Sequence, residues 1–342
     1  MTKFILVDTA NLYFKSRYIA SRHSDDLEKV AMALFLTLSS VNSMVRKFTN
    51  NDNYHVVFAL EGRSWRKDYY APYKANRTAK HASLTDKELE LDKMFWETYD
   101  VFTTFLREKT NVSVLRCPTA EGDDIIARFV HLHPNDEHVI ISSDGDFAQL
   151  ISKNVTQYNS ISGHMITLDG YYDDRGREVK DKKTKEHKKL GDPKYLLFEK
   201  CMRGDTSDNV FSAYPGVRTK GTKKTIGLID AYDDRDTRGF AWNNMMLQRW
   251  LDHNNQEHRV LDDYERNVTL CDLSAQPQVV KDDIDECIKQ GLSTVTKAAV
   301  GINLMKFCGK YELNKINDNI DSYSRWINSC YSGTLLEQKH TT

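Results

Sequence analysis

The 342-residue sequence has no apolar run near the roughly 20 residues that a membrane-spanning helix needs. The apolar part of its first segment, Met1 to Asp8, is too short for a secretory signal and ends in an acid. The six cysteines are scattered, and the absence of a C-x-x-C pair argues against a zinc or redox motif. These absences predict a cytoplasmic protein with reduced cysteines and no membrane segment.

An excess of charge is also lacking, because the formal net charge is only −1. The molecule as a whole therefore does not attract nucleic acid, and any such binding must come from local patches. No Ser–His–Asp or Cys–His arrangement stands out, and the eleven histidines show no metal-ligand spacing. An apolar content of 40% supports a real core, and the length allows one large domain or two ordinary ones.

What the sequence does contain is carboxylates at the ends of apolar strands. Continuous apolar runs near residues 4–7, 55–60, 112–117 and 138–141 predict buried strands that alternate with helices. An acid follows each run, at once or after a few residues: Asp8, Glu61, Glu121 and Asp144. The carboxyl ends of parallel strands meet at one edge, so the pattern predicts an α/β fold whose mainly parallel sheet has one acidic edge.

The acids are densest between Glu121 and Asp146. Thr119 is expected to cap a helix, which places Glu121, Asp123 and Asp124 in its first turn. Asp144 and Asp146 then follow the strand at residues 138–141. Helix capping and a tight turn would explain one acid each, but neither explains five acids at one edge of a sheet.

A further pair of acids, three residues apart, follows a helix expected to begin at Pro193 with Asp192 as its N-cap. The candidate metal ligands are therefore Asp8, Glu61, Glu121, Asp123, Asp124, Asp144, Asp146, Asp205 and Asp208. So many ionised carboxylates require cations to offset their repulsion, and Mg²⁺ suits oxygen ligands, with Mn²⁺ as a substitute. Two ions about 3.5–4 Å apart can stabilise both the attacking and the leaving oxygen in phosphodiester hydrolysis.

Two stretches are rich in cations. Residues 62–85 carry six Lys or Arg against one acid, with Trp65, Tyr69, Tyr70 and Tyr73 among them. This composition is typical of a single-strand binding segment, or of a solvated helix whose aromatic side chains pack inward. The second stretch is a glycine-containing turn suited to a phosphate backbone, or a plain solvated loop, and contains Gly216, Arg218, Lys220, Gly221, Lys223 and Lys224.

Five motifs in this order resemble the 5′ nuclease or flap endonuclease family. They are Asp8 after the first strand, Tyr73-Lys74-Ala75-Asn76-Arg77, Glu121-Gly122-Asp123-Asp124, Ser143-Asp144-Gly145-Asp146 and Gly204-Asp205-Thr206-Ser207-Asp208-Asn209. The sequence resembles in particular the bacteriophage branch, which includes phage ribonuclease H and phage 5′–3′ exonucleases. The resemblance covers roughly residues 3–275. Glu61 departs from it, because most members carry Asp at that position.

The resemblance implies a PIN-like nuclease domain at residues 1–185, with a basic arch near 62–95. It also implies a smaller helical DNA-binding domain at 186–342, with a helix–three-turn–helix near 192–232 that can hold K⁺. Asp146 with Lys74 and Arg77 would then be catalytic. The residues that would contact nucleic acid are Arg66, Lys67, Tyr73, Lys74, Arg77, Gly216, Arg218, Lys220, Gly221, Lys223 and Lys224.

The resulting hypothesis is a monomeric Mg²⁺-dependent 5′ nuclease. Its substrates would be branched or 5′-ended DNA and RNA–DNA duplexes during primer removal, in the host cytoplasm if the source is viral. A single-strand-binding protein of replication is a candidate partner. Two alternatives stay open: a Mg²⁺-dependent phosphohydrolase of small molecules, which has no use for two basic elements, and a non-catalytic binder of DNA junctions, which has no use for so many acids.

Overall fold

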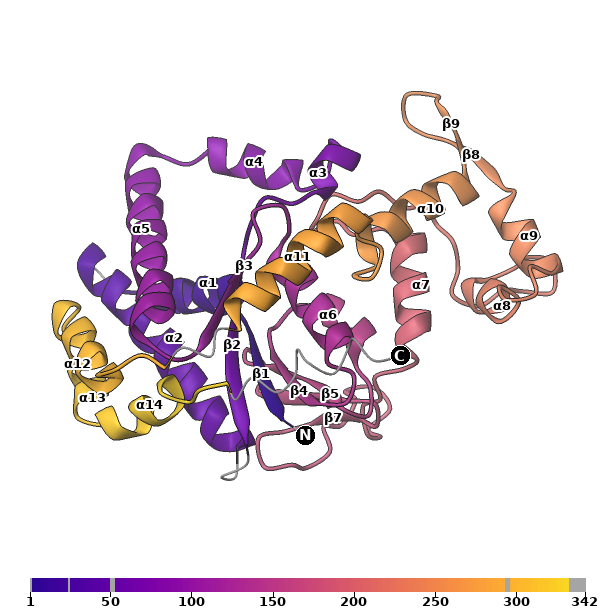
Figure 1. Cartoon of the computed structure of the whole chain (residues 1–342). Helices are drawn as coiled ribbons and strands as arrows, with labels where there is room; N and C mark the ends of the chain where they lie inside the picture. Colours follow the sequence, from indigo (N-terminus) through magenta and orange to yellow (C-terminus); the bar gives the residue numbers. More distant parts are fainter. Residues whose placement is uncertain (1, 24, 50–52, 293–295, 332–342) are drawn as a thin grey trace. The chain divides into compact units, whose positions relative to one another are not determined.

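The computed structural model describes residues 2–23, 25–49, 53–292 and 296–331, which belong to two compact units (Figure 1). The first unit comprises the described residues of Met1–Arg63, Leu84–Leu190 and Gln278–Thr342. The second comprises Ser64–Ser83 and Gly191–Pro277. The boundary near residue 185 stays a prediction, and the described residues from Gln278 onward belong to the first unit.

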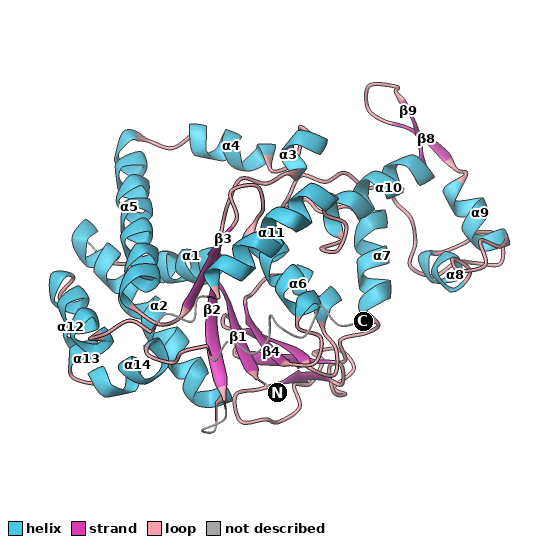
Figure 2. Ribbon diagram, in the orientation of Figure 1, coloured by secondary structure: helices cyan, strands magenta, loops and turns pink. Residues whose placement is uncertain are grey.

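Within the described residues, the main sheet of the first unit has seven strands in the order β3-β2-β1-β4-β5-β6-β7 (Figure 2). The strands are β1 (Lys3–Asp8), β2 (Tyr54–Leu60), β3 (Ser113–Arg116), β4 (Glu137–Ile141), β5 (Val155–Asn159), β6 (His164–Thr167) and β7 (Gly170–Tyr172). Strands β1 to β5 pair in parallel, and β6 and β7 add an antiparallel edge. The mainly parallel sheet expected from the apolar runs is confirmed.

Helices cover both faces of this sheet. Alternate residues of β1 point to opposite faces: Ile5 and Val7 belong to the large core, while Phe4 packs edge-to-face on Phe129 with ring centroids 4.9 Å apart. The helices that contribute to the large core are α1 (Thr9–Ala20), α2 (Asp26–Phe48), α5 (Asp86–Lys109), α12 (Val300–Lys310), α13 (Asn314–Asn317) and α14 (Ile320–Ile327). On the other face lies α6 (Gly122–Leu132), and α11 (Gln278–Gly291) packs on α6 and β3.

The second unit is mainly helical. Its elements are α3 (Arg66–Tyr69), α4 (Ala75–Ala82), α7 (Pro193–Arg203), α8 (Leu228–Asp233), α9 (Phe240–Met246), α10 (Val260–Cys271) and the hairpin of β8 (Arg249–Leu251) and β9 (Glu257–Arg259). The expected start of α7 is confirmed, because the Asp192 carboxylate accepts a hydrogen bond from the Lys194 N–H at 3.0 Å. The helix ends at Gly204, whose φ of 75° favours glycine.

A candidate metal centre and two basic elements

Three neighbouring strands bring acids to the carboxyl edge of the main sheet. Strand β1 lies between β2 and β4, with Asp8 opposite Ala59 and Val7 opposite Ile141. Glu61 directly follows β2, so it lies at the same edge as Asp8. The strand order also reverses at β1, and open α/β sheets bind their ligands at such a switch point.

Asp8 is held from two sides. Its Oδ1 accepts a hydrogen bond from the Asn11 N–H at 3.1 Å, which caps α1, and its Oδ2 accepts one from the buried Ser142 hydroxyl at 2.8 Å. Asn11 Oδ1 in turn accepts from the Ser143 N–H at 3.0 Å and from its hydroxyl at 2.8 Å. These side chains tie the ends of β1 and β4 together and fix the orientation of the Asp8 carboxylate.

The first turn of α6 gathers three carboxylates. One ligand oxygen from each of Glu121, Asp123 and Asp124 lies within 4.8 Å of the other two. Glu121 and Asp124 are buried, and Asp123 is half-buried. The Asp124 carboxylate accepts from the Glu121 N–H at 3.3 Å, and the Asp123 carboxylate accepts from the Asp124 N–H at 2.7 Å. The helix N-terminus favours negative charge, but three ionised carboxylates at this spacing still call for a cation.

The start of α6 differs from the expectation. Glu121 is the N-cap, and Thr119 lies outside the helix. The Thr119 hydroxyl instead donates to Asp283 of α11 at 2.9 Å. The predicted capping role of Thr119 is therefore wrong, because its hydroxyl serves a contact with a helix 164 positions further along the chain.

Glu61 links the end of β2 to these three acids. Its Oε2 accepts a hydrogen bond from the Gly122 N–H at 3.2 Å. A Cβ at Gly122 would lie 3.5 Å from the Glu61 Oε1, an ordinary van der Waals contact, so this carboxylate lies next to the first residue of the helix. The longer side chain of Glu61 thus reaches the first turn of α6.

Asp144 and Asp146 follow β4: Asp144 is the N-cap of the 3₁₀ helix η1 (Gly145–Leu150), and Asp146 lies in its first turn. Asp144 is exposed and Asp146 half-buried, and the Asp144 Oδ1 accepts from the Asp146 N–H at 2.9 Å. Gln157 fixes the loop by donating to the carbonyls of Ser142 at 3.0 Å and Asp144 at 2.5 Å. Among the described residues, only Glu121, Asp123 and Asp124 form a group with ligand atoms within 4.8 Å; the other acids of this edge lie outside it.

Tyr99 of α5 places a further polar atom near this edge. Its hydroxyl is buried and has no hydrogen-bond partner among the described residues. Burial raises the pKa of Tyr99, and the charges of Glu61 and Asp8 raise it further, so the phenol stays neutral. A buried unpaired donor costs about 1–3 kcal/mol, which a water molecule bound beside the carboxylates would recover. Mg²⁺ prefers oxygen ligands and keeps several of its waters. The carboxylate oxygens of this edge and the Tyr99 hydroxyl, which can donate to a water, both fit such an ion.

The first acid of the pair in the second unit is engaged locally. Asp205 forms an ion pair with Lys200 at 2.7 Å and accepts from the Ser207 N–H at 2.8 Å. Burial alone would raise the pKa of Asp205, but the Lys200 ion pair and the Ser207 hydrogen bonds lower it to about 2. Its carboxylate is therefore charged at physiological pH.

Asp208 gathers the residues expected at the reacting strand. Its carboxylate accepts from the Tyr73 hydroxyl at 3.0 Å and from Arg77 at 2.6 Å, and lies 3.5 Å from the Lys74 ammonium. Lys74 adopts a left-handed conformation with φ of 55°, and its N–H donates to the Asp208 carbonyl at 2.8 Å. An expected metal ligand and two expected catalytic cations thus form one network within the second unit.

The basic, aromatic stretch divides into buried and exposed residues. Trp65 and Tyr73 are buried, which matches the inward-packing alternative for these two. Arg66 is only 1% exposed, and its Nε donates to the Leu270 carbonyl at 2.8 Å. Arg66 therefore stabilises the second unit and has no surface for a phosphate, in contrast to its expected role. Lys67 is exposed.

The turn before α8 presents its cations to solvent. Arg218, Lys220, Lys223 and Lys224 are all exposed. Gly216 has φ of 75°, and a Cβ at Gly221 would overlap the Thr225 carbonyl, so both positions favour glycine. The turn therefore presents four positively charged side chains to solvent.

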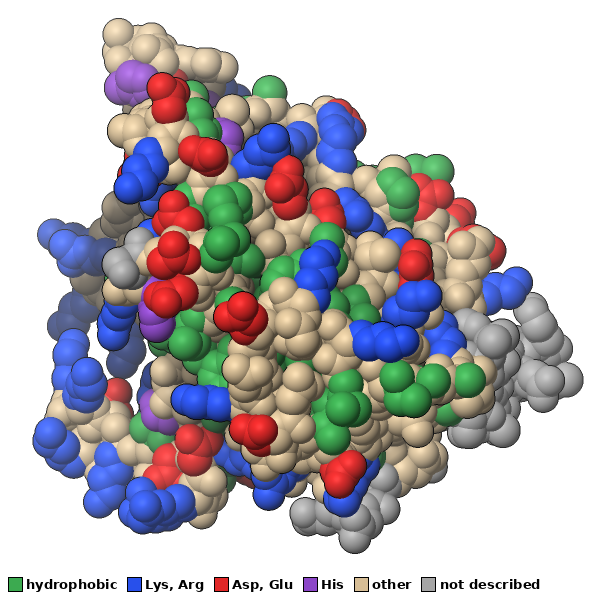
Figure 3. All heavy atoms as spheres, turned by 90° about the vertical axis from the view of Figure 1, so that its left-hand side faces the viewer, with side chains coloured by type: hydrophobic (Ala, Val, Ile, Leu, Met, Phe, Trp, Pro, Cys, Tyr) green, Lys and Arg blue, Asp and Glu red, His purple; other side chains and the backbone are tan. Residues whose placement is uncertain are grey.

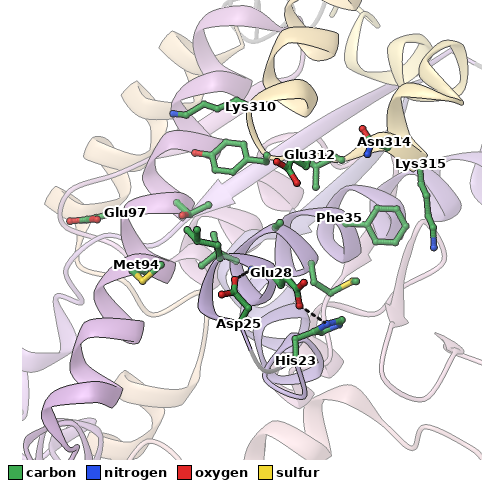
Figure 4. A pocket seen from close by; sticks show the side chains of 17 residues that line it. His23, Asp25, Glu28, Phe35, Met94, Glu97, Lys310, Glu312, Asn314 and Lys315 are labelled. Atoms are coloured by element: carbon green, nitrogen blue, oxygen red, sulfur yellow. Dashed lines mark hydrogen bonds and ion pairs between the residues drawn. The ribbon is translucent and has the colours of Figure 1, made fainter.

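The cavity in Figure 4 lies elsewhere in the first unit. It has a volume of about 800 Å³ and is lined by α2, α5 and residues 310–315, including Phe35, Met94 and Lys315. None of the candidate metal ligands lines it.

Figure 3 shows Lys and Arg side chains among Asp and Glu side chains over the centre of the face that it draws. Along the left-hand edge of this view Lys and Arg side chains predominate. Among the described residues, no helix is both long and apolar enough to cross a bilayer.

The mainly parallel sheet and its acidic edge define an α/β protein with a candidate centre for divalent metal. Residues 3–184 match the family model described as 5′-3′ exonuclease, N-terminal resolvase-like domain. The match spans more than half of the sequence, and the chain belongs to this family.

Three relatives illustrate the match. A 5′-3′ exonuclease of Mycoplasmopsis pulmonis is 25% identical over 227 residues, which are 66% of each chain. A flap endonuclease of Escherichia phage T5 is 26% identical over 229 residues, covering 66% of this chain and 68% of the relative. A DNA polymerase I of Rhizobium leguminosarum is 27% identical over 246 residues, and the match spans 68% of this chain but only 21% of the polymerase.

Solved structures support the fold. The T5 D15 protein co-crystallized with metal ions aligns with a TM-score of 0.57 and 22% identity, over 85% of this chain and 98% of that one. A pseudo-enzyme-product complex of the T5 D15 flap endonuclease with DNA and metal ions gives the same TM-score at 20% identity, over 85% and 100%. At these identities the likeness concerns the fold alone.

Proposed function

We propose that the protein is a Mg²⁺-dependent 5′ nuclease, acting as a 5′–3′ exonuclease and flap endonuclease. It hydrolyses phosphodiester bonds at the 5′ ends or flaps of DNA and of RNA–DNA duplexes. The observation that carries the proposal is the group of Glu121, Asp123 and Asp124, with Asp8 and Glu61 at the same sheet edge. Membership of the 5′-3′ exonuclease family supports it.

The acids of the first unit would hold the metal. The proposed ligands there are Asp8, Glu61, Glu121, Asp123, Asp124, Asp144 and Asp146. When bound, Mg²⁺ (two ions in our proposal) would supply a nucleophilic hydroxide near neutral pH and would stabilise charge on the phosphate oxygens. Ser142 and Asn11 fix the orientation of the Asp8 carboxylate at this edge, and the neutral Tyr99 hydroxyl would donate to a water molecule there.

Lys74 and Arg77 would act on the reacting strand. Their cations are held together by Asp208, so a phosphate approaching them meets a preorganised pair. Asp205 and Asp208 are proposed to complete the set of metal ligands. Exposed Lys67 is proposed to guide the single strand. Tyr73 supports Lys74 indirectly, because both side chains contact the Asp208 carboxylate.

The turn from Gly216 to Lys224 would hold duplex DNA through its phosphates. Its exposed cations and its compact backbone favour phosphate contacts, which carry no base information. We propose that α7, this turn and α8 form a helix–three-turn–helix that can bind K⁺ beside the duplex. Nuclease chemistry is assigned to residues 1–185 and DNA holding to the helical part that begins at residue 186.

The cellular setting is also a proposal. The likeness to part of a DNA polymerase I supports a place in replication, where the enzyme would remove RNA primers. We propose a monomer in the cytoplasm, that of the host if the protein is viral, with a single-strand-binding protein as its partner.

A substrate panel tests the proposed function. In Mg²⁺, the protein should cut a 5′-labelled flap and the 5′ end of an RNA–DNA duplex, and leave a 3′ flap and para-nitrophenyl phosphate intact. Turnover of the small ester alone would favour a small-molecule phosphohydrolase. Tight flap binding without any cleavage would favour a non-catalytic junction binder.

Two substitutions of Glu61 should separate the effect of its charge from the effect of its side-chain length. Glu61→Asp is expected to be mild, because the carboxylate survives at a position where most members of the family carry Asp. Glu61→Gln should raise the Mg²⁺ concentration needed for half-maximal cleavage, since the charge near the first turn of α6 is lost. The exposed Glu108→Gln on α5 is the matched control. Wild-type Mg²⁺ dependence in both Glu61 variants would remove Glu61 from the metal centre.

Removing three cations from the turn should weaken duplex binding uniformly. In the variant with Lys220, Lys223 and Lys224 all changed to Ala, affinity should fall similarly on unrelated sequences. The slope of log affinity against log salt should become shallower by roughly one unit per lost contact, so up to about three. The measurement is binding of metal-free protein to blunt duplex across a salt series. An unchanged slope would place the duplex on another surface, such as residues 175–189, a stretch rich in Lys and Arg between β7 and α7.

A further inference from the structure

Helix α11 returns from the end of the sequence to the segment that carries the acids of α6. It packs on α6 and on β3, the two elements joined by residues 117–121 (Figure 1). All of these elements belong to the first unit. Helix α11 contacts this segment at three separate points: one on β3, one on the loop and one on α6.

The first contact is a two-pronged ion pair. Arg128 of α6 donates from Nε and from a terminal guanidinium nitrogen to the two carboxylate oxygens of Asp285, at 2.6 Å each. The side chains are 16% and 36% exposed, so solvent screens the pair only partly. Arg128 lies one helical turn after Asp124, so a pair with fixed geometry at this position sets the rotation of the helix.

The second contact holds the loop that leads into the acids. Asp283 accepts from the Thr119 hydroxyl at 2.9 Å, two residues before Glu121. On its other side the same loop is held by backbone hydrogen bonds, from the Gly62 N–H to the Ala120 carbonyl at 3.0 Å and from the Arg63 N–H to the Pro118 carbonyl at 2.9 Å. The loop is thus fixed between the end of β2 and α11.

The third contact fixes the end of α11. A Cβ at Gly291 would overlap the Leu115 side chain of β3, so the last turn of the helix lies directly on the strand. Leu115 is fully buried. With one point on β3, one on the loop and one on α6, α11 constrains all three parts of the segment that presents the acids.

We propose that α11 is a clamp for the metal centre, in which Asp283 and Asp285 are positioning residues that act through Thr119 and Arg128. The inference rests on the proposed function, since it concerns the acids that would hold Mg²⁺. Ligand oxygens grouped within 4.8 Å must keep their relative positions to share an ion, and the clamp holds the turn that bears them. Loss of the clamp should therefore lower the metal affinity of protein that is still folded.

The test measures Mn²⁺ binding by calorimetry, with Mn²⁺ in place of Mg²⁺ and without nucleic acid. The double variant Thr119→Val with Asp285→Asn should bind Mn²⁺ roughly fivefold more weakly than the wild type, below the 10- to 100-fold loss typical of direct ligand partners. Thr119→Ser, which keeps the hydroxyl, should bind normally. Glu286→Gln is the control, because its carboxylate accepts from Gln290 within α11.

Urea unfolding of each variant distinguishes a clamp from a general stabilising contact. A positioning role predicts weaker Mn²⁺ binding by protein that is still fully folded at the temperature of the titration. Unchanged Mn²⁺ affinity in the folded double variant would overturn the clamp while leaving the proposed function intact. A wild type that binds no Mn²⁺ would instead overturn the proposed metal centre, and the clamp with it.

Discussion

Asp146→Asn should reduce flap cleavage at saturating Mg²⁺ by about 10³-fold, comparable to the loss of a preorganised charge-stabilising group. The side chain keeps its size but loses the charge that would help to hold a cation near the phosphate. Folding should change little, because the hydrogen bond from Asp146 to the Asp144 carboxylate uses the backbone N–H, which the substitution retains.

The measurement is single-turnover cleavage of a 5′-labelled flap, together with the midpoint of thermal unfolding. Asp169→Asn is the matched control, since Asp169 is an exposed acid in the turn between β6 and β7. Near wild-type cleavage by Asp146→Asn would show that the metal centre does not depend on the acids after β4.

Lys74→Ala should slow single-turnover cleavage by about 100-fold while weakening flap binding only slightly. An ammonium beside the scissile phosphate stabilises most as charge develops in the transition state, so its loss affects the chemical step. The backbone N–H of Lys74 still donates to Asp208 in the variant, and Arg77 still pairs with that carboxylate, so the local fold should survive.

Lys80→Ala serves as the control, because Lys80 is an exposed cation on α4, the helix that directly follows Lys74. It should alter neither the rate nor the affinity by much. Equal losses of binding and of cleavage in Lys74→Ala would mean that Lys74 only tethers the strand.

The sequence predicts the acidic edge well for a physical reason. Strands buried on both faces are continuously apolar, so their ends are visible, and parallel pairing then brings those ends together. The ends of β1, β2 and β4 follow this rule: Asp8 is the last residue of β1, and Glu61 and Asp144 come after β2 and β4. The cap of α7 is equally predictable, because Asp192 and Pro193 act through local backbone geometry.

The support of the metal centre cannot be predicted in the same way. Asn11, Ser142 and Tyr99 are ordinary polar residues whose roles depend on which strands and helices become neighbours. Thr119 resembles a cap because capping is a local signal, whereas its partner Asp283 lies far along the chain. Contacts of this kind have no local periodicity or spacing to reveal them.

Composition also fails to separate buried from exposed cations in residues 62–85. Arg66 and Lys67 are adjacent and equally basic, yet the first is buried against the Leu270 carbonyl and the second faces solvent. A guanidinium can be buried when its N–H groups find acceptors, and only the tertiary fold supplies them.

The most direct test of the central claim is flap cleavage as a function of metal. Wild-type protein stripped with EDTA should cut no flap, and activity should return as Mg²⁺ is added back. The same titration of Asp146→Asn should stay near the baseline. Full cleavage by the wild type in excess EDTA would contradict a metal centre at the carboxyl edge of this sheet.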